Sequence, residues 1–270
     1  MDFELLKKLR QRTQASLSLC KKALVETNND IEKSVDWLRK KNIIRSSKSA
    51  DREAGVRGVF IYEFNSHHTV YVVMCTESDF VLRNNKFENA IKGLLSESKD
   101  IKTAQDFETK ASEQLKELNG LLGERIVVKD FYNIKIPNDN YGIYVHKLDG
   151  MIKNIGLVFA EGLEGKEGVK SALNDIAVHI SGLAPKYLNT NDVEEEFLNK
   201  EKEIFLHAHE DKPANVQEKI WQGKKQKIFA EHVLLKQKML DNENITVEGR
   251  LEQLKEDGKS IVIKNYMLIK

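Results

Sequence analysis

The chain has 270 residues, of which 40% are hydrophobic and 31% are charged, and its formal net charge at pH 7 is +1. This composition supports packed cores under a strongly solvated surface. A net charge so close to zero argues against direct nucleic-acid binding, because nucleic-acid-binding domains usually carry a clear excess of Lys and Arg. No apolar run approaches the ~20 residues that span a bilayer, so we expect no membrane contact. The two cysteines, Cys20 and Cys75, form no paired motif, which fits a reducing, cytoplasmic environment.

Residues 3–41 show the spacing of three short helices, marked by Leu5, Leu6 and Leu9, by Leu17, Cys20 and Leu24, and by Ile31, Val35 and Leu38. Asp30 follows two asparagines and is placed to cap the third helix. A bundle of about 40 residues is marginally stable alone, so we expect it to gain stability by docking on a partner. Its lysines and arginines form either a basic binding face or a solvated surface that complements the helix C-termini, and the pattern leaves both interpretations open.

A polar, serine-rich linker is predicted at 45–55, and an alternating hairpin follows at 56–64 and 69–75. Helical spacing then continues to about Ser96. Beyond it we expect a second helix, marked by Phe107, Ala111, Leu115 and Leu118, and a strand at 124–132.

The junction between the hairpin and its helix, Ser78-Asp79-Phe80, combines an acid with a large aromatic side chain. Ser78 or Asp79 is placed to cap the helix that follows. Strand-to-helix junctions often project functional side chains out of a rigid scaffold. Two interpretations therefore stand side by side. Asp79 and Phe80 form a functional tip, or Asp79 is only a cap and Phe80 only a core anchor.

The second half of the chain repeats the plan of hairpin, loop and helix. Strands at 141–148 and 152–160 flank Asp149-Gly150, a strong signal for a tight turn. A helix is predicted at 169–183, ending before Pro185. The final alternating run, 260–269, predicts a strand that returns to this second sheet.

A highly charged helical stretch lies between that helix and the final strand, from Val193 to about Lys238. Asp192 is a plausible cap, and Pro213 marks a break between two helices. The predicted fold class is α+β with antiparallel sheets. Its parts are a three-helix bundle at 1–44, a linker at 45–55, one subdomain at 56–139, a related subdomain at 140–192 and 239–270, and a protruding helical hairpin inserted at 193–238.

No pattern in the chain predicts an enzyme, a cofactor or a metal site. The glycine-rich loop at 162–168 lacks two features of a phosphate-binding loop, since Ala160 replaces its first glycine and Glu167 its Ser or Thr. His207 and His209 stand two residues apart on a predicted helix, so they do not share a face.

Several segments match one family in order and spacing. They are Leu9-Arg-Gln-Arg-Thr13, Cys20-Lys-Lys-Ala-Leu24, Asn29-Asp-Ile-Glu-Lys33, Trp37-Leu-Arg-Lys40 and Glu77-Ser-Asp-Phe-Val81. The last resembles the Thr-Asp-Phe-Val signature of the elongation factor Ts family, and the others resemble its opening helices. The resemblance implies that the N-terminal bundle is similar to a ubiquitin-associated (UBA-like) domain.

The same resemblance implies a guanine nucleotide exchange factor, which acts by binding and not as an enzyme. Its partner is the GTPase elongation factor Tu in the GDP-bound state. Ser78, Asp79, Phe80 and Val81 are implied to promote GDP release by disturbing the partner's magnesium and nucleotide site.

Further partner contacts are implied at Arg12, Leu17, Leu19 and His179. The turn between the first two helices departs from the family, because Thr13-Gln-Ala-Ser-Leu-Ser-Leu-Cys20 lacks the usual glycines. Under two other interpretations the protein would have no exchange activity. It would be an adaptor for ubiquitin-like proteins, or a factor that binds ribosomes or RNA.

Overall fold

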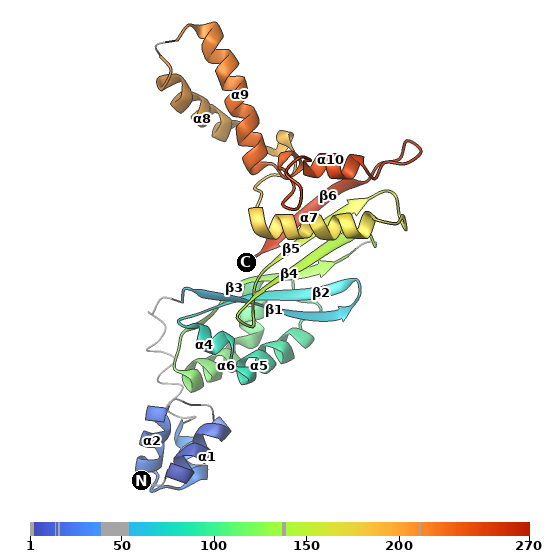
Figure 1. Ribbon diagram of the computed structural model, residues 1–270. Coiled ribbons are helices and arrows are strands. Elements are labelled where there is room, and N and C mark those ends of the chain that lie inside the picture. The colour runs from blue at the N-terminus through green and yellow to red at the C-terminus, as the bar shows by residue number, and fades with distance from the viewer. Residues whose placement is uncertain (1–2, 14, 16, 39–53, 137–138, 211) are drawn as a thin grey trace. The chain divides into compact units, whose positions relative to one another are not determined.

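The computed structural model describes residues 3–13, 15, 17–38, 54–136, 139–210 and 212–270, without the side chains of 11 and 12 (Figure 1). The predicted linker at 45–55 lies mostly outside these residues. The chain forms two compact units. The first contains Met1–Lys135, Lys147–Lys153 and Lys270, and the second contains Ile136–His146 and Asn154–Ile269.

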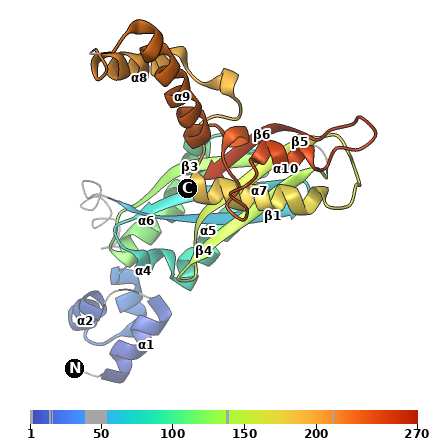
Figure 2. The same cartoon turned by 45° about the horizontal axis from the view of Figure 1, so that its top comes forward.

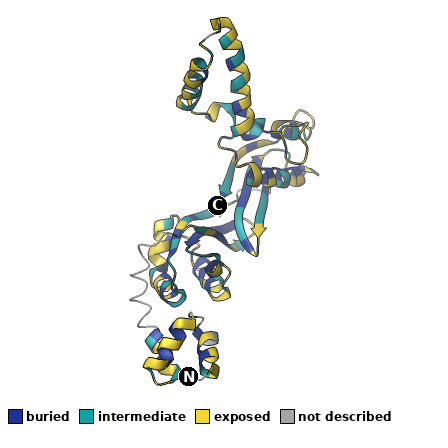
Figure 3. Ribbon diagram, turned by 60° about the vertical axis from the view of Figure 1, so that its left-hand side comes forward, coloured by how far each residue is buried: buried dark blue, intermediate teal, exposed yellow. Residues whose placement is uncertain are grey.

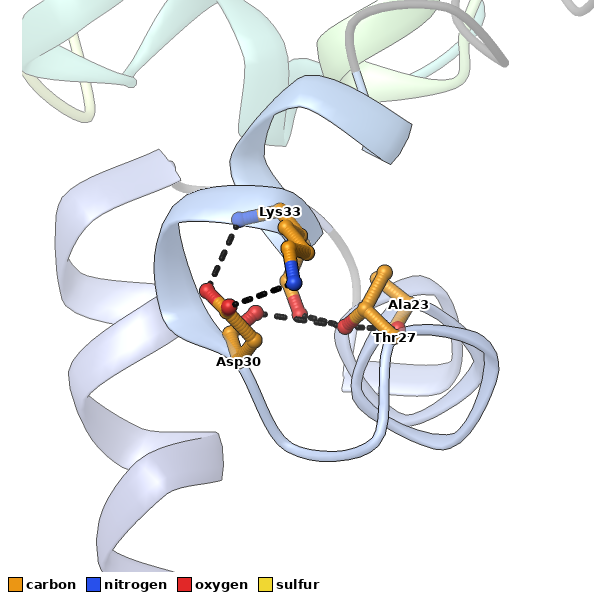
Figure 4. Close-up of polar contacts among 5 residues, drawn as sticks. Ala23, Thr27, Asp30 and Lys33 are labelled. Atoms are coloured by element: carbon orange, nitrogen blue, oxygen red, sulfur yellow. Dashed lines mark hydrogen bonds and ion pairs between the residues drawn. The ribbon is translucent and has the colours of Figure 1, made fainter.

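Two helices, α1 (Phe3–Thr13) and α2 (Leu17–Glu26), and a helical segment at 31–38 form a small N-terminal bundle around buried leucines. The prediction that Asp30 caps the third segment is confirmed (Figure 4). Its carboxylate accepts the Lys33 backbone N–H at 3.0 Å, and the Thr27 hydroxyl donates to the Ala23 carbonyl at 2.8 Å. These bonds fix the turn between α2 and the following segment.

The first sheet is antiparallel, with the order β1 (Val56–Asn65), β2 (His68–Thr76) and β3 (Ile126–Lys135). The central strand β2 is buried along its whole length, and its alternate residues Val70, Val72 and Met74 belong to the core that the helices of this unit complete. Helices α5 (Asn85–Ser96) and α6 (Ala104–Leu122) contribute the apolar side chains that complete this core. The predicted hairpin, second helix and third strand are therefore confirmed.

The prediction that one helix runs from Ser78 or Asp79 to about Ser96 is wrong. A single turn, α4 (Asp79–Leu82), precedes α5 and is separate from it. The side chain of Asn84 caps α5 by accepting the backbone N–H groups of Lys86 and Phe87. Ser78 stands at the N-cap position of α4 but makes no side-chain capping bond.

The second sheet has the order β4 (Tyr141–Leu148), β5 (Met151–Glu161) and β6 (Val262–Ile269). The turn at Asp149-Gly150 has positive φ at both residues, 51° and 79°, which is typical of a type I′ hairpin. Strand β6 pairs antiparallel with β5, so the predicted return of the final strand is confirmed.

Helices α7 (Val169–Leu183) and α10 (Val247–Glu252) bury their apolar faces against strands β5 and β6 (Figure 2). Two glycines permit this packing. A β-carbon at Gly142 would lie 2.0 Å from the carbonyl oxygen of Leu173, and one at Gly156 would lie 2.1 Å from that of Ala177. Both distances are far below contact, so glycine is required where α7 crosses β4 and β5.

The inserted stretch forms a helical hairpin of α8 (Glu195–His207) and α9 (Ala214–His232), with exposed residues along both outer faces (Figure 3). Phe205, Trp221 and Ile228 form a small apolar core between the two helices. The prediction that Asp192 caps the charged helical stretch that begins at Val193 is wrong. Asp192 closes a capping box with Asn189 around the short 3-10 helix η1 (Thr190–Asp192).

A second 3-10 helix, η2 (Leu234–Lys236), follows α9. Within the described part of the chain, none of the helices combines the length and the apolar character needed to cross a bilayer.

Replacing Gly156 with Ala tests the close approach of α7. We expect the free energy of unfolding to fall by about 1–3 kcal/mol, because α7 must shift or the strand must distort. The matched control is Gly93→Ala on α5, where an added β-carbon meets no atom within 4 Å. The control should gain about 0.5–1 kcal/mol, because alanine favours the helix. Denaturant titration measures both, and equal effects would contradict the packing argument.

Candidate functional site

Phe80 is the most exposed large apolar side chain of the described residues, with 82% of its surface open to solvent. It lies on α4, the single turn that follows β2. The next two residues, Val81 and Leu82, are both 4% exposed and belong to the first core. Successive side chains of a helix point about 100° apart, so burying Val81 and Leu82 turns Phe80 outward. The interpretation of Phe80 as a core anchor is therefore wrong.

The turn before Phe80 is held by an acid that lies just before β3, the strand that pairs with β2. Glu124 accepts two hydrogen bonds from Ser78, one from its backbone N–H at 2.8 Å and one from its hydroxyl at 2.5 Å. In the opposite direction, Glu77 accepts the backbone N–H of Arg125 at 2.7 Å. These reciprocal, charge-assisted bonds fasten the turn to the start of β3.

The interpretation of Asp79 as only a helix cap is wrong, because Ser78 holds the N-cap position of α4 and Asp79 makes an ion pair. Its carboxylate lies 2.7 Å from the Arg83 guanidinium, one helical turn further along the chain. The same guanidinium nitrogen lies 3.7 Å from the carboxylate of Asp149, at the tip of the β4–β5 hairpin. All three side chains are substantially exposed to solvent. Asp79, the residue before the exposed ring, thus belongs to a group of one cation and two acids.

The N-terminal residues predicted to contact a partner differ in accessibility. Leu17 is 52% exposed and is available to a partner. Leu19 is only 9% exposed and packs in the core of the N-terminal bundle. The side chain of Arg12 lies outside the described part of the structure. Leu17 is thus accessible from solvent, whereas the side chain of Leu19 lies inside the bundle.

His179, predicted at a partner contact, is completely buried on α7. Its Nε2 lies 3.0 Å from the side-chain oxygen of Gln237, whose amide nitrogen donates to the carbonyl of Glu231. Its Nδ1 is buried without a hydrogen-bond partner. Burial lowers the pKa of His179 below its usual 6.5, although Gln237 and Asp241 act in the opposite direction. In this conformation the imidazole packs inside the second unit and offers no surface to a partner.

The glycine-rich loop after β5 uses its lysine internally. The Lys166 ammonium donates to the Leu254 carbonyl at 2.6 Å and lies 3.1 Å from Glu256. This arrangement leaves the lysine poorly placed to bind phosphate, in agreement with the sequence argument. Among the described residues, no group of three or more His, Cys, Asp or Glu side chains gathers in a way that suits a metal ion.

Neither cysteine is activated as a nucleophile. Cys20 and Cys75 are buried free thiols, and burial raises the pKa of both. The thiolate is the reactive form of cysteine, and a raised pKa keeps both groups protonated at neutral pH. Both side chains therefore serve as core residues.

Sequence reasoning found Asp79 and Phe80 but missed Glu124 and Asp149, which surround them. Glu124 lies 46 residues from Ser78 in the chain, so no local pattern reports their contact. The Asp149-Gly150 turn was recognised, but only as a turn. Its signal as a site residue would have been an acid at a hairpin tip, which is a common feature of surface turns.

The fold and this site define a class of protein: an α+β protein that presents an exposed aromatic ring on a turn fastened by hydrogen bonds. The sequence pattern of the family described as Elongation factor TS matches residues 77–269. The chain therefore belongs to the elongation factor Ts family. The match begins at Glu77 and includes the whole Ser78-Asp79-Phe80 turn. Family members are translation elongation factors that work as nucleotide exchange factors for elongation factor Tu, without catalytic chemistry of their own.

Replacing Glu124 with Gln tests the fastening of the turn. We expect the Ser78 amide to exchange its hydrogen about tenfold faster, because hydrogen bonds to charged acceptors contribute about 1.5–3 kcal/mol. Hydrogen exchange followed by NMR measures the effect. The control is Glu117→Gln on the exposed face of α6, which should leave Ser78 unchanged. Unaltered exchange at Ser78 in the Glu124 variant would show that the buried neighbours alone hold the turn.

The burial of His179 predicts a pH dependence of stability. Its pKa is below 6.5 in the folded state and near 6.5 in the unfolded state. The unfolded chain therefore binds more protons below about pH 6.5, and stability is lost as the pH falls through that window. Denaturation midpoints measured between pH 7.5 and 5 should fall less steeply in His179→Gln than in the wild type. The same substitution at exposed His67 should keep the wild-type slope, and parallel slopes for all three would refute the assignment.

Proposed function

We propose that this chain is a guanine nucleotide exchange factor that binds elongation factor Tu in its GDP-bound state and promotes GDP release. One observation carries the proposal: Phe80 is 82% exposed on a turn fastened by Glu124, within the region that matches the elongation factor Ts family. An apolar ring held out in water on a fixed support is suited to enter a partner.

Exchange by binding requires that the affinities of the GTPase for its two ligands, the exchange factor and the nucleotide, are coupled. The factor must prefer a form of the partner that holds nucleotide weakly, and nucleotide must then weaken factor binding by the same ratio. Burying a phenylalanine ring contributes roughly 1.5–3 kcal/mol, which is enough to support a local rearrangement of the partner. Phe80 supplies this apolar contribution.

The neighbours of Phe80 have separate roles in the proposal. Asp79 brings a negative charge close to the partner's magnesium site and disturbs its electrostatic balance. Val81 is buried and anchors the turn, so it acts through the position of Phe80 and not by contact. Ser78 fixes the approach of the turn through its bonds to Glu124.

The N-terminal bundle adds a second docking surface. We infer that it is UBA-like and that its exposed Leu17 contacts the partner's nucleotide domain, with Arg12 as a further contact. Such a protein acts in the cytoplasm, where translation takes place, and itself needs neither GDP nor magnesium.

Replacing Phe80 with Ala is the direct test of the exchange proposal. The fold should be unaffected, because the ring packs against little of its own chain. Stimulated release of labelled GDP from elongation factor Tu should slow about 10- to 100-fold, since the lost apolar contact is worth roughly 1.5–3 kcal/mol. Phe80→Leu keeps part of the apolar surface, so the GDP release rate that it stimulates should lie between those of the wild type and Phe80→Ala.

Ile204, which is also exposed, offers a control, because Ile204→Ala removes an apolar side chain from α8, outside the N-terminal bundle. This control should stimulate release nearly as well as the wild type. Full activity of Phe80→Ala would remove the ring from the mechanism. Failure of the wild type to accelerate GDP release at all would refute the exchange function and favour an adaptor role.

A further inference from the structure

Arg83 stands between two carboxylates that compete for it. One guanidinium nitrogen lies 2.7 Å from Asp79 and 3.7 Å from Asp149. The first distance is a close ion pair, and the second is a longer ion pair near the 4 Å limit of direct contact. A guanidinium carries five N–H donors in a fixed fork, so a small rotation of its side chain exchanges one acid for the other.

The position of Asp149 is fixed by the fold. Residues 147–153 pack within the first unit, and Met151 is buried in that unit's core. Asp149 itself has the left-handed φ of 51° that its tight turn with Gly150 requires. The carboxylate is therefore held beside the Phe80 turn by backbone geometry, and the turn does not depend on its charge.

Under the proposed function, Asp79 must both bind Arg83 in the free protein and act on a cation of the partner. As long as Arg83 binds it at 2.7 Å, its negative charge is largely compensated. To act on a cation in the partner, Asp79 must leave Arg83, and a guanidinium without a counter-ion opposes that step. A second acid within reach of the same nitrogen lowers the barrier, because the guanidinium keeps a partner throughout.

We propose that Asp149 is a positioning residue for exchange, which takes over Arg83 when Asp79 turns toward the partner's cation. This inference rests on the proposed exchange function and adds to it a residue from a separate hairpin. In the free protein Arg83 holds Asp79 in an ion pair. Asp149 allows Asp79 to leave that pair, because it can bind Arg83 in its place.

The test uses three full-length variants: Asp149→Asn, Arg83→Gln and the double variant. Asn followed by Gly favours the same type I′ turn, so Asp149→Asn keeps the hairpin and removes only the charge. Since exposed ion pairs are weak, we expect this variant to stimulate GDP release about two- to fivefold less than the wild type. Arg83→Gln frees Asp79 and should stimulate release at least as well as the wild type. In its background the Asp149 substitution should have no further effect.

Two readouts separate this role from a structural one. The deficit of Asp149→Asn should shrink as salt is raised to 1 M, because screening weakens exposed ion pairs. Thermal unfolding of all three variants should match the wild type. Wild-type activity of Asp149→Asn, an equal deficit in the Arg83→Gln background, or a loss of activity on Arg83→Gln alone would each overturn the proposal. A wild-type protein without exchange activity would instead refute the function on which it rests.

Discussion

The candidate site depends on the burial of two adjacent side chains in a single helical turn. Val81 and Leu82 enter the first core, and the ~100° step between helical residues then directs Phe80 to solvent. The apolar contact that holds the turn is therefore separate from the apolar surface that the turn presents. A ring that helped to stabilise its own fold would have to leave that fold before it entered a partner. Here no such rearrangement is required.

The rest of the first unit keeps that turn rigid. Strand β2 lies between β1 and β3 and is buried throughout, so its end is a fixed point from which α4 begins. Glu124 precedes β3, the strand that pairs with β2, and binds Ser78 across this short distance. The sheet thus brings together two segments that are far apart in the sequence. Holding the turn before the partner arrives reduces the ordering cost of association, which is how a small apolar surface gains affinity.

Local patterns predicted much of the fold because its elements have local signals. Helix α7 has the predicted bounds, since its apolar stripe is regular and a proline follows it closely. The Asp149-Gly150 turn was recognisable from two residues. The break between α4 and α5 was missed, because Asn84 resembles any polar residue on a helix until its side chain is seen to accept backbone N–H groups. The same limit explains Asp192, whose side chain accepts the backbone N–H of Asn189 in a capping box that spacing alone does not reveal.

In the candidate site, too, some features could be predicted from local sequence and others could not. The identity of Asp79 and Phe80 as site candidates came from a short motif, but the exposure of both side chains to solvent did not. Whether a residue is buried depends on which face of its element meets a core, and Leu19 and His179 lie on the covered faces of α2 and α7. The contact of Ser78 with Glu124 follows from the pairing of β2 with β3, and that of Arg83 with Asp149 joins the end of α4 to the tip of the β4–β5 hairpin. Neither contact can be read from local spacing. A motif can therefore name the tip of this protein, but only the assembled sheet explains why the ring remains outside.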